Sequence, residues 1–101
     1  MKAVTVINFF SIRPGKIDEF IELQRNFAGG STRPNGLLGG RMYRSMDEKS
    51  AVLVSQFESK DAQQKILQSD AFKQHISSLR ALVESSSPSL YEEAYTTGNF
   101  K

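Results

Sequence analysis

The pattern that most constrains this chain is a pair of strand-like segments that are apolar on both sides. Side chains alternate between the two faces of a strand. In residues 4–12, one face carries Val4, Val6, Phe10 and Ile12, whereas the other carries Ile7 and Phe9. Residues 51–57 repeat this arrangement, with Val52 and Val54 on one face and Ala51, Leu53 and Phe57 on the other. Strands with two apolar faces are buried on both sides.

Turn and periodicity signals divide the following part of the chain. Pro14-Gly15 ends the first strand, and Lys16 opens a helix. Its predicted apolar face consists of residues that recur every three or four positions, namely Ile17, Phe20, Ile21, Gln24 and Phe27. Residues 28–36 form a glycine-bearing loop, and residues 37–45 a second strand in which Gly39-Gly40 predicts either a bulge or a close backbone approach. A polar turn at 46–50 then leads into the third strand, residues 51–57.

Two short helices and a last strand complete the predicted order. Ser59 or Asp61 caps the first of these helices, which carries Ala62 and Ile66. Ser69 caps the second, whose apolar face is predicted to run through Phe72, His75 or Ile76, Leu79, and Leu82 or Val83. The serine-rich residues 85–89 end the helices, and residues 90–96 form the final strand. This order predicts one α+β domain, residues 1–101, with a ferredoxin-like four-stranded antiparallel sheet and helices on one face.

Helices on one face leave the second apolar face of the sheet without cover. One chain of 101 residues has too few helices to bury both faces. A second copy that packs sheet to sheet buries the remaining face simply, and twofold pairing is the commonest symmetry. Each large side chain buried in this way contributes about 1.5–3 kcal/mol. The sequence therefore predicts a homodimer with a barrel-like pair of sheets.

Composition disfavours several classes of function. The chain has 13 basic and 11 acidic residues and no basic cluster, so a nucleic-acid partner is not expected. It has no cysteine and one histidine, so a single chain cannot build a disulfide, a thiolate metal site or a three-histidine site. No phosphate-binding or dinucleotide motif is present, which disfavours flavin and nicotinamide. No membrane-spanning run and no signal-peptide cleavage site are found, so the cytoplasm is the default location.

Two polar residues on apolar faces are the candidate catalytic groups. Asn8 shares its face with Val6 and Phe10, where an amide needs a partner. It either ties down a neighbouring turn or points into a ligand pocket. His75 lies on the apolar face of its helix and is either a hydrogen-bonded core residue or a base that titrates near neutral pH.

Aromatic residues supply the candidate substrate-binding walls. If Asn8 and His75 face a common pocket between sheet and helix, its walls are expected to include Phe10, Phe57 and Phe72. Tyr43 either offers a hydroxyl contact to an oxygenated substrate or is an ordinary residue of the strand surface.

The series of motifs resembles the antibiotic biosynthesis monooxygenase family. The resemblance begins with strand one ending in Pro14-Gly15-Lys16 and with Phe20, and it covers nearly the whole chain. It continues through Pro34-x-Gly36-x-x-Gly39 into Arg41-x-Tyr43-Arg44-Ser45, then through the run from Val52 to Ser59, and ends with Ser69-Asp-Ala-Phe72-Lys-Gln-His75. Each motif is weak alone, whereas their order and spacing together are specific. The family implies a dimeric α+β barrel.

The resemblance implies more than one chemistry. Some members oxygenate polycyclic aromatic hydroquinone- or anthrone-like substrates without metal or flavin, and Asn8 and His75 suit the donor and base that such chemistry requires. Others degrade haem and share the strand-one Asn, here Asn8. Two departures from those members argue against haem degradation. Ile66 stands where the haem-distorting Trp would be, and the haem-ligating His would fall at Ile76. Phe57 replaces a Trp common at the end of strand three.

Three functions therefore compete. The leading hypothesis is a cofactor-independent monooxygenase, without metal or flavin, that acts on an aromatic or quinol-like small molecule. The first alternative is a non-catalytic dimer that binds a small hydrophobic metabolite. The second is a haem-degrading monooxygenase.

Overall fold

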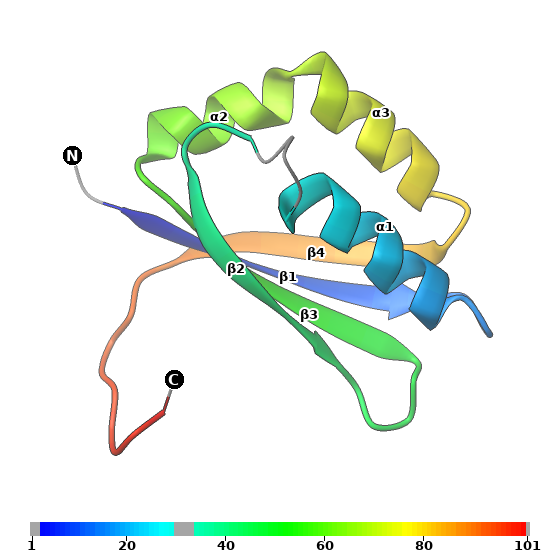
Figure 1. The fold of residues 1–101 in the computed structure, drawn as a ribbon. Coiled ribbons are helices and arrows are strands. Elements are labelled where there is room, and N and C mark those ends of the chain that lie inside the picture. The colour runs from blue at the N-terminus through cyan, green and yellow to red at the C-terminus, as the bar shows by residue number, and fades with distance from the viewer. Residues whose placement is uncertain (1–2, 30–33, 101) are drawn as a thin grey trace.

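The computed structural model describes residues 3–29 and 34–100. Over these residues, strands and helices follow one another in the predicted order (Figure 1). The elements are β1 (Val4–Ile12), α1 (Ile17–Gly29), β2 (Leu37–Arg44), β3 (Ser50–Phe57), α2 (Lys60–Gln68), α3 (Asp70–Leu79) and β4 (Val83–Tyr91).

The strands form one antiparallel sheet in the order β2-β3-β1-β4. Figure 1 shows the helices on one side of this sheet, which we call the inner face, while the opposite outer face carries no helix of the described residues. The predicted ferredoxin-like α+β fold is confirmed. No helix within residues 3–29 or 34–100 has the length and apolar character needed to cross a membrane.

Local signals explain why several elements begin and bend where they do. The hydroxyl oxygen of Ser59 accepts a hydrogen bond from the backbone N–H of Ala62, and Ser69 caps α3 in the same way through Phe72. A β-bulge is present one residue before the predicted Gly39-Gly40, because the register of β2 against β3 shifts between Leu37 and Gly39. Gly40 itself lies close to the backbone of β3, where an added Cβ would stand 3.0 Å from the carbonyl oxygen of Val54.

The last strand was placed wrongly by its sequence pattern. β4 is Val83–Tyr91, so the serine-rich segment is itself the strand and residues 92–96 follow it. Serine is a poor strand former, yet β1 offers an open edge, and eight residues of β4 lie opposite residues of β1. Tertiary pairing therefore outweighs propensity. Pro88, which has no N–H to donate, is tolerated because β4 is an edge strand.

Helix ends differ from the prediction by smaller amounts. α3 ends at Leu79, so Leu82 belongs to the following turn and Val83 to β4. α1 continues to Gly29, and residues 30–33 of the predicted loop lie outside the described residues. Leu82 still reaches the core as predicted for an apolar position, at 4% exposure.

The core lies between one end of the inner face and helices α1 and α3. It consists of apolar side chains that are at least 95% buried, namely Phe10, Ile12, Ile17, Phe20, Ala51, Leu79 and Leu82. Phe20 has no exposed surface, and its ring lies 4.8 Å from that of Phe10 in a tilted arrangement. This end of the inner face is packed by the chain's own residues.

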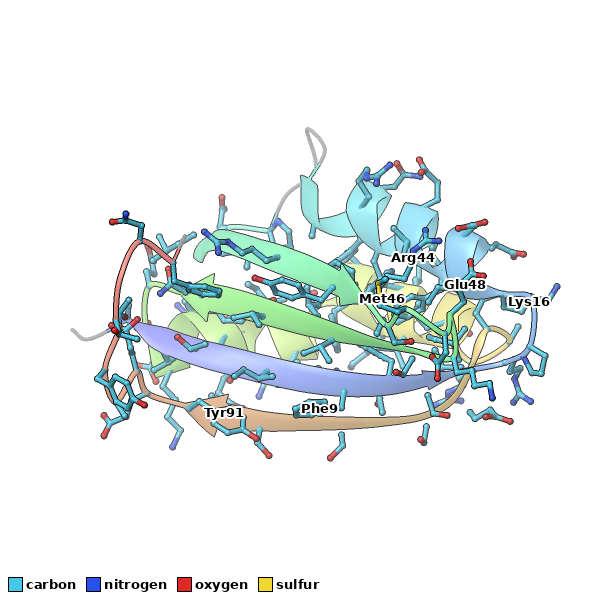
Figure 2. All side chains as sticks on the ribbon, turned by 90° about the horizontal axis from the view of Figure 1, so that it is seen from below. Phe9, Lys16, Arg44, Met46, Glu48 and Tyr91 are labelled. Carbon is cyan, nitrogen blue, oxygen red and sulfur yellow. The ribbon has the colours of Figure 1, made fainter. Side chains whose placement is uncertain are left out.

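The outer face carries apolar side chains that this chain does not cover. Phe9 on β1 is 51% exposed and Tyr91 on β4 is 45% exposed, and Figure 2 shows both on this face. Ile7, Val52 and Val54 are half-buried on the same side. The double-faced apolar pattern of β1 and β3 therefore corresponds to one covered and one uncovered face.

Candidate functional site

Asn8 lies in the middle of β1 on the inner face. Residues directly opposite one another in an antiparallel pair share a face, and Asn8 stands opposite Leu53 of β3 and Pro88 of β4. Its Oδ1 accepts a hydrogen bond of 3.1 Å from the backbone N–H of Ser87. Because a backbone N–H only donates, the amide is oriented with its oxygen towards β4. Its two side-chain N–H groups are then left to meet another acceptor.

His75 is buried in the contact between α3 and α1. The side chain is 7% exposed, and its Nε2 is hydrogen-bonded to Oε1 of Gln24, which is 8% exposed. Buried polar side chains need such partners. The polar pair joins two helices across a sequence separation of 51 residues.

Aromatic rings fix the plane of the His75 imidazole. The ring of Phe27 stacks on it with centroids 4.1 Å apart and an angle of 8° between the planes. Phe72 completes the cluster, with its ring 6.5 Å from the imidazole and 6.1 Å from Phe27. Gln24 and Phe27 are three residues apart on α1, a spacing that places both on one side of the helix. One helix face therefore supplies both the hydrogen bond and the stacking partner.

The burial of His75 favours its uncharged form. Desolvation lowers the pKa of the imidazole below its ordinary value of 6.5. At neutral pH the ring is therefore neutral, and one of its nitrogens carries a lone pair. A neutral imidazole in this state can accept a proton.

The two ring nitrogens of His75 differ in their hydrogen bonding. Among the described residues, Nδ1 has no hydrogen-bond partner, whereas no buried side-chain nitrogen or oxygen of these residues lacks one. Nδ1 is therefore not fully enclosed. It can accept a hydrogen bond or a proton without first losing a hydrogen bond to the described residues.

A wide hollow lies next to the aromatic cluster. It has a volume of about 600 Å³ and is lined by Phe27 together with residues of α2, including Ala62 and Ile66. Glu58, Asp61 and Lys65 add charged groups to its lining. His75 and Asn8 do not line this hollow, but Phe27 forms part of its wall and stacks on His75.

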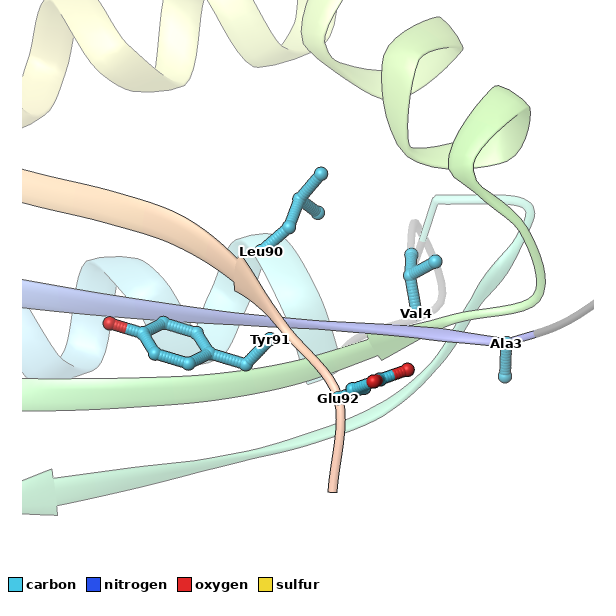
Figure 3. Close-up of a pocket in the computed structure, with 5 residues that line it drawn as sticks. All are labelled: Ala3, Val4, Leu90, Tyr91 and Glu92. Carbon is cyan, nitrogen blue, oxygen red and sulfur yellow. The ribbon is translucent and has the colours of Figure 1, made fainter. Parts of the chain in front are cut away.

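A second, smaller hollow lies at the end of the sheet where β1 begins and β4 ends. It measures about 280 Å³ and is lined by residues that include Val4 and Leu90. Figure 3 shows these two side chains pointing towards the helices, whereas Tyr91 points the other way. Leu90 is 47% exposed although it lies on the inner face. The helices therefore cover this end of the inner face less completely than the core end.

The structure places the four predicted substrate-binding residues at four separate positions. Phe72 is in ring contact with His75 as part of the aromatic cluster. Phe10 belongs to the core, and Phe57 is half-buried on the inner face opposite Val4. Tyr43 stands opposite Val52 on the outer face and is 44% exposed. Tyr43 therefore does not share a face with Asn8.

Gln24 and Phe27 contact His75, but the sequence predicted no catalytic or binding role for either residue. Both were placed on the apolar face of their helix, and that position was confirmed for Gln24 by its burial. A glutamine at a position otherwise reserved for apolar residues was the available signal. Within residues 3–29 and 34–100 no group of three or more His, Cys, Asp or Glu side chains could hold a metal ion.

The comparisons with known proteins agree with this architecture. SnoaB, a cofactor-independent oxygenase from Streptomyces nogalater, is 27% identical, and its superposition has a TM-score of 0.83 over 95% of this chain and 97% of that chain. Rv0793 from Mycobacterium tuberculosis is 17% identical, with a TM-score of 0.78 over 96% of this chain and 100% of that chain. PA3566 from Pseudomonas aeruginosa is 14% identical, with a TM-score of 0.78 over 94% and 97%. At such identities the last two show a shared fold.

Family membership rests on a broader match. The comparison with curated proteins found no match. Residues 3–78, more than half of the 101 residues, match the family described as antibiotic biosynthesis monooxygenase. The matched region includes Asn8 on β1, Gln24 on α1 and His75 on α3. The chain belongs to the antibiotic biosynthesis monooxygenase family.

Proposed function

We propose that this protein is a cofactor-independent monooxygenase that acts on an aromatic or quinol-like small molecule. The observation that carries the proposal is the buried, neutral imidazole of His75, whose Nδ1 is not enclosed and which lies against the rings of Phe27 and Phe72. Family membership and the similarity to SnoaB, itself a cofactor-independent oxygenase, support the same reaction class.

His75 would act as the general base. A phenolic or activated C–H proton of the substrate passes to Nδ1, while Nε2–H continues to donate to Gln24 Oε1. General base catalysis of this kind contributes about 10²–10⁴-fold to a rate. The neighbouring aromatic rings exclude water, which strengthens electrostatic interactions inside the site. The residues thus favour formation of a substrate anion.

Asn8 would stabilise that anion. Its oxygen is engaged by Ser87, so its N–H groups are the part of the amide that can donate to a developing oxyanion. For this role we propose that Asn8 and His75 face the same space between sheet and helices. Asn8 also ties β4 to β1, and the structural and catalytic roles are compatible because they use different atoms of one amide.

The electrons for oxygen reduction would come from the substrate itself. The substrate anion transfers an electron to dioxygen, and recombination forms a C–O bond to give a peroxide. Loss of water from this peroxide leaves a carbonyl group. In sum, a CH₂ group and O₂ become C=O and H₂O, and no external reductant is consumed.

We further propose that the protein works as a homodimer through its outer face. Phe9, Tyr43 and Tyr91 are 51%, 44% and 45% exposed there, and a second copy would cover them. The helix-free face in Figure 1 is the side on which a second sheet would pack. Light scattering at micromolar protein concentration should give twice the chain mass of 11.3 kDa. A single species of the chain mass would contradict the dimer.

Oxygen consumption tests the reaction. The purified protein, checked for iron, copper and flavin by elemental analysis and absorption spectroscopy, is mixed with a panel of hydroquinones and anthrone-like compounds in an oxygen electrode. We expect substrate-dependent uptake without added metal or cofactor. Binding of these compounds without uptake would support the non-catalytic alternative. A hemin titration that gives a stoichiometric Soret band and haem loss with a reductant would support haem degradation instead.

A further inference from the structure

The contact between Gln24 and His75 is an unusual use of a helix position. The face of α1 that points into the protein is otherwise apolar, with Ile17 at 4% and Phe20 at 0% exposure, yet Gln24 is as deeply placed at 8%. A buried amide there has a cost that only a hydrogen bond offsets. Its oxygen is bonded to Nε2 of His75.

We propose that Gln24 is a positioning residue that holds His75 with its hydrogen on Nε2 and its lone pair on Nδ1. An amide oxygen only accepts, so the nitrogen that faces it must carry the hydrogen. In a neutral imidazole the other nitrogen is then the acceptor. This inference rests on the proposed function, because it identifies which atom of His75 takes the proton.

The surroundings of the ring agree with this assignment. Phe27, three residues after Gln24, stacks on the imidazole at 4.1 Å and 8°, so α1 sets the plane of the ring as well as its tautomer. Nδ1 has no hydrogen-bond partner among the described residues but is not fully enclosed. The nitrogen that Gln24 leaves without hydrogen is thus the one that the described residues leave without a hydrogen-bond partner.

The same hydrogen bond serves both protonation states of the ring. When Nδ1 takes a proton, the Nε2–H group continues to donate to Gln24 Oε1, and the imidazolium needs no new partner. Preorganised groups of this kind cost no reorganisation at the moment of reaction. Gln24 would contribute through His75 without touching the substrate.

The single histidine of the chain makes the tautomer directly measurable. A long-range ¹H–¹⁵N correlation spectrum of ¹⁵N-labelled protein at neutral pH contains only the His75 ring signals. We expect the pattern of a ring protonated at Nε2. A ring protonated at Nδ1 would mean that Gln24 presents its N–H₂ group to Nε2, and this result would overturn the inference.

Three variants separate positioning from packing. Gln24→Leu should change the His75 ring shifts and lower its pKa further, since the imidazolium loses its acceptor. Gln24→Glu retains an acceptor, so it should keep the Nε2–H pattern and raise the pKa of His75. This variant also tests the inference if the Leu variant does not fold. Gln63→Leu is the matched control, because Gln63 is also 8% exposed but its oxygen bonds to Gln64. Unchanged ring shifts and pKa in both Gln24 variants would contradict the inference.

Kinetics distinguish this inference from the proposed function. With an accepted substrate, Gln24→Leu should lower kcat by about 10–100-fold, a loss of the size found when the hydrogen-bond partner of a metal-ligating histidine is removed, while KM changes little. An unchanged kcat would show that Gln24 does not position the base. If the wild-type protein consumes no oxygen with any substrate, the proposed function fails, whereas the tautomer in the spectrum still tests the role of Gln24.

Discussion

Two pairs of stacked or packed rings, each with one ring from α1, lie in contrasting surroundings. Phe20 packs on Phe10 with centroids 4.8 Å apart in a wholly apolar core. Two helical turns further on, Phe27 stacks at 4.1 Å on His75, which is hydrogen-bonded to Gln24. The first pair adds burial and nothing else. The second keeps a titratable ring and an amide out of water, at a cost that an apolar pair would avoid.

This difference indicates that the two ends of the inner face have different roles. The core end is closed by the chain itself, whereas the other end keeps polar groups and incompletely covered side chains such as Leu90. A half-satisfied buried polar group is worse for stability than an apolar one. The polar groups around His75 therefore call for an explanation other than stability, and the proposed role of His75 as a base would supply one.

The largest expected effect on stability is at the core end. Phe20→Ala should lower the free energy of unfolding by about 3–5 kcal/mol, because it removes a fully buried ring and leaves a cavity. Chemical denaturation followed by circular dichroism measures it. Phe100→Ala is the matched control, since Phe100 is 74% exposed and its loss should change stability by no more than about 0.5 kcal/mol. Equal effects of the two variants would show that the core is misplaced.

Asn8 tests the polar end, where the expected effect is on the reaction. Asn8→Ala should slow oxygenation of an accepted substrate by about 10²–10³-fold if its amide stabilises an oxyanion. Its effect on stability should be smaller, about 0.5–1.5 kcal/mol for the lost hydrogen bond to Ser87. Asn26→Ala, at an exposed position of α1, is the control. A variant that loses stability but keeps its rate would leave Asn8 with the structural role alone.

The lowered pKa of His75 predicts a direction for the pH dependence of stability. Below about pH 6.5 the imidazole of the unfolded chain takes up a proton before that of the folded protein. The contribution of His75 to stability is therefore complete above this pH and falls as the pH decreases towards the folded-state pKa. Denaturation curves between pH 5 and 8 measure the trend. His75→Gln should flatten it, and an increase in stability on acidification that His75→Gln abolishes would contradict it.

The smallest effect is expected at the surface, where Arg44 joins β2 to α1 and to the hairpin turn. Its guanidinium lies 2.7 Å from Asp18 and 3.4 Å from Glu48, and Figure 2 shows Arg44 and Glu48 side by side. These groups are exposed, so Arg44→Met should cost no more than about 1 kcal/mol. The cost should fall further in high salt. A loss as large as that of Phe20→Ala would show that this surface is part of the core.

The sequence predicted most of the fold because its signals are local. The alternation in β1 and the caps Ser59 and Ser69 placed their elements correctly. β4 was misplaced because its strand character comes from pairing with β1 and not from its serines. Asn8 and His75 stood out as polar residues on apolar faces. Gln24 was a polar residue on an apolar face as well, but its pairing with His75 could not be predicted, because the contact joins helices across 51 residues of sequence and forms only on folding.

The role of His75 as the base is measured most directly by the oxygenation rate of His75→Gln beside that of the wild type. Glutamine keeps a hydrogen-bonding group near Gln24 but cannot accept a proton at neutral pH. We predict that the variant stays folded and binds the aromatic substrate, while its rate of oxygen consumption falls by about 10²–10⁴-fold. A rate equal to that of the wild type would contradict the account, because His75 would then be a hydrogen-bonded core residue and the base would lie elsewhere.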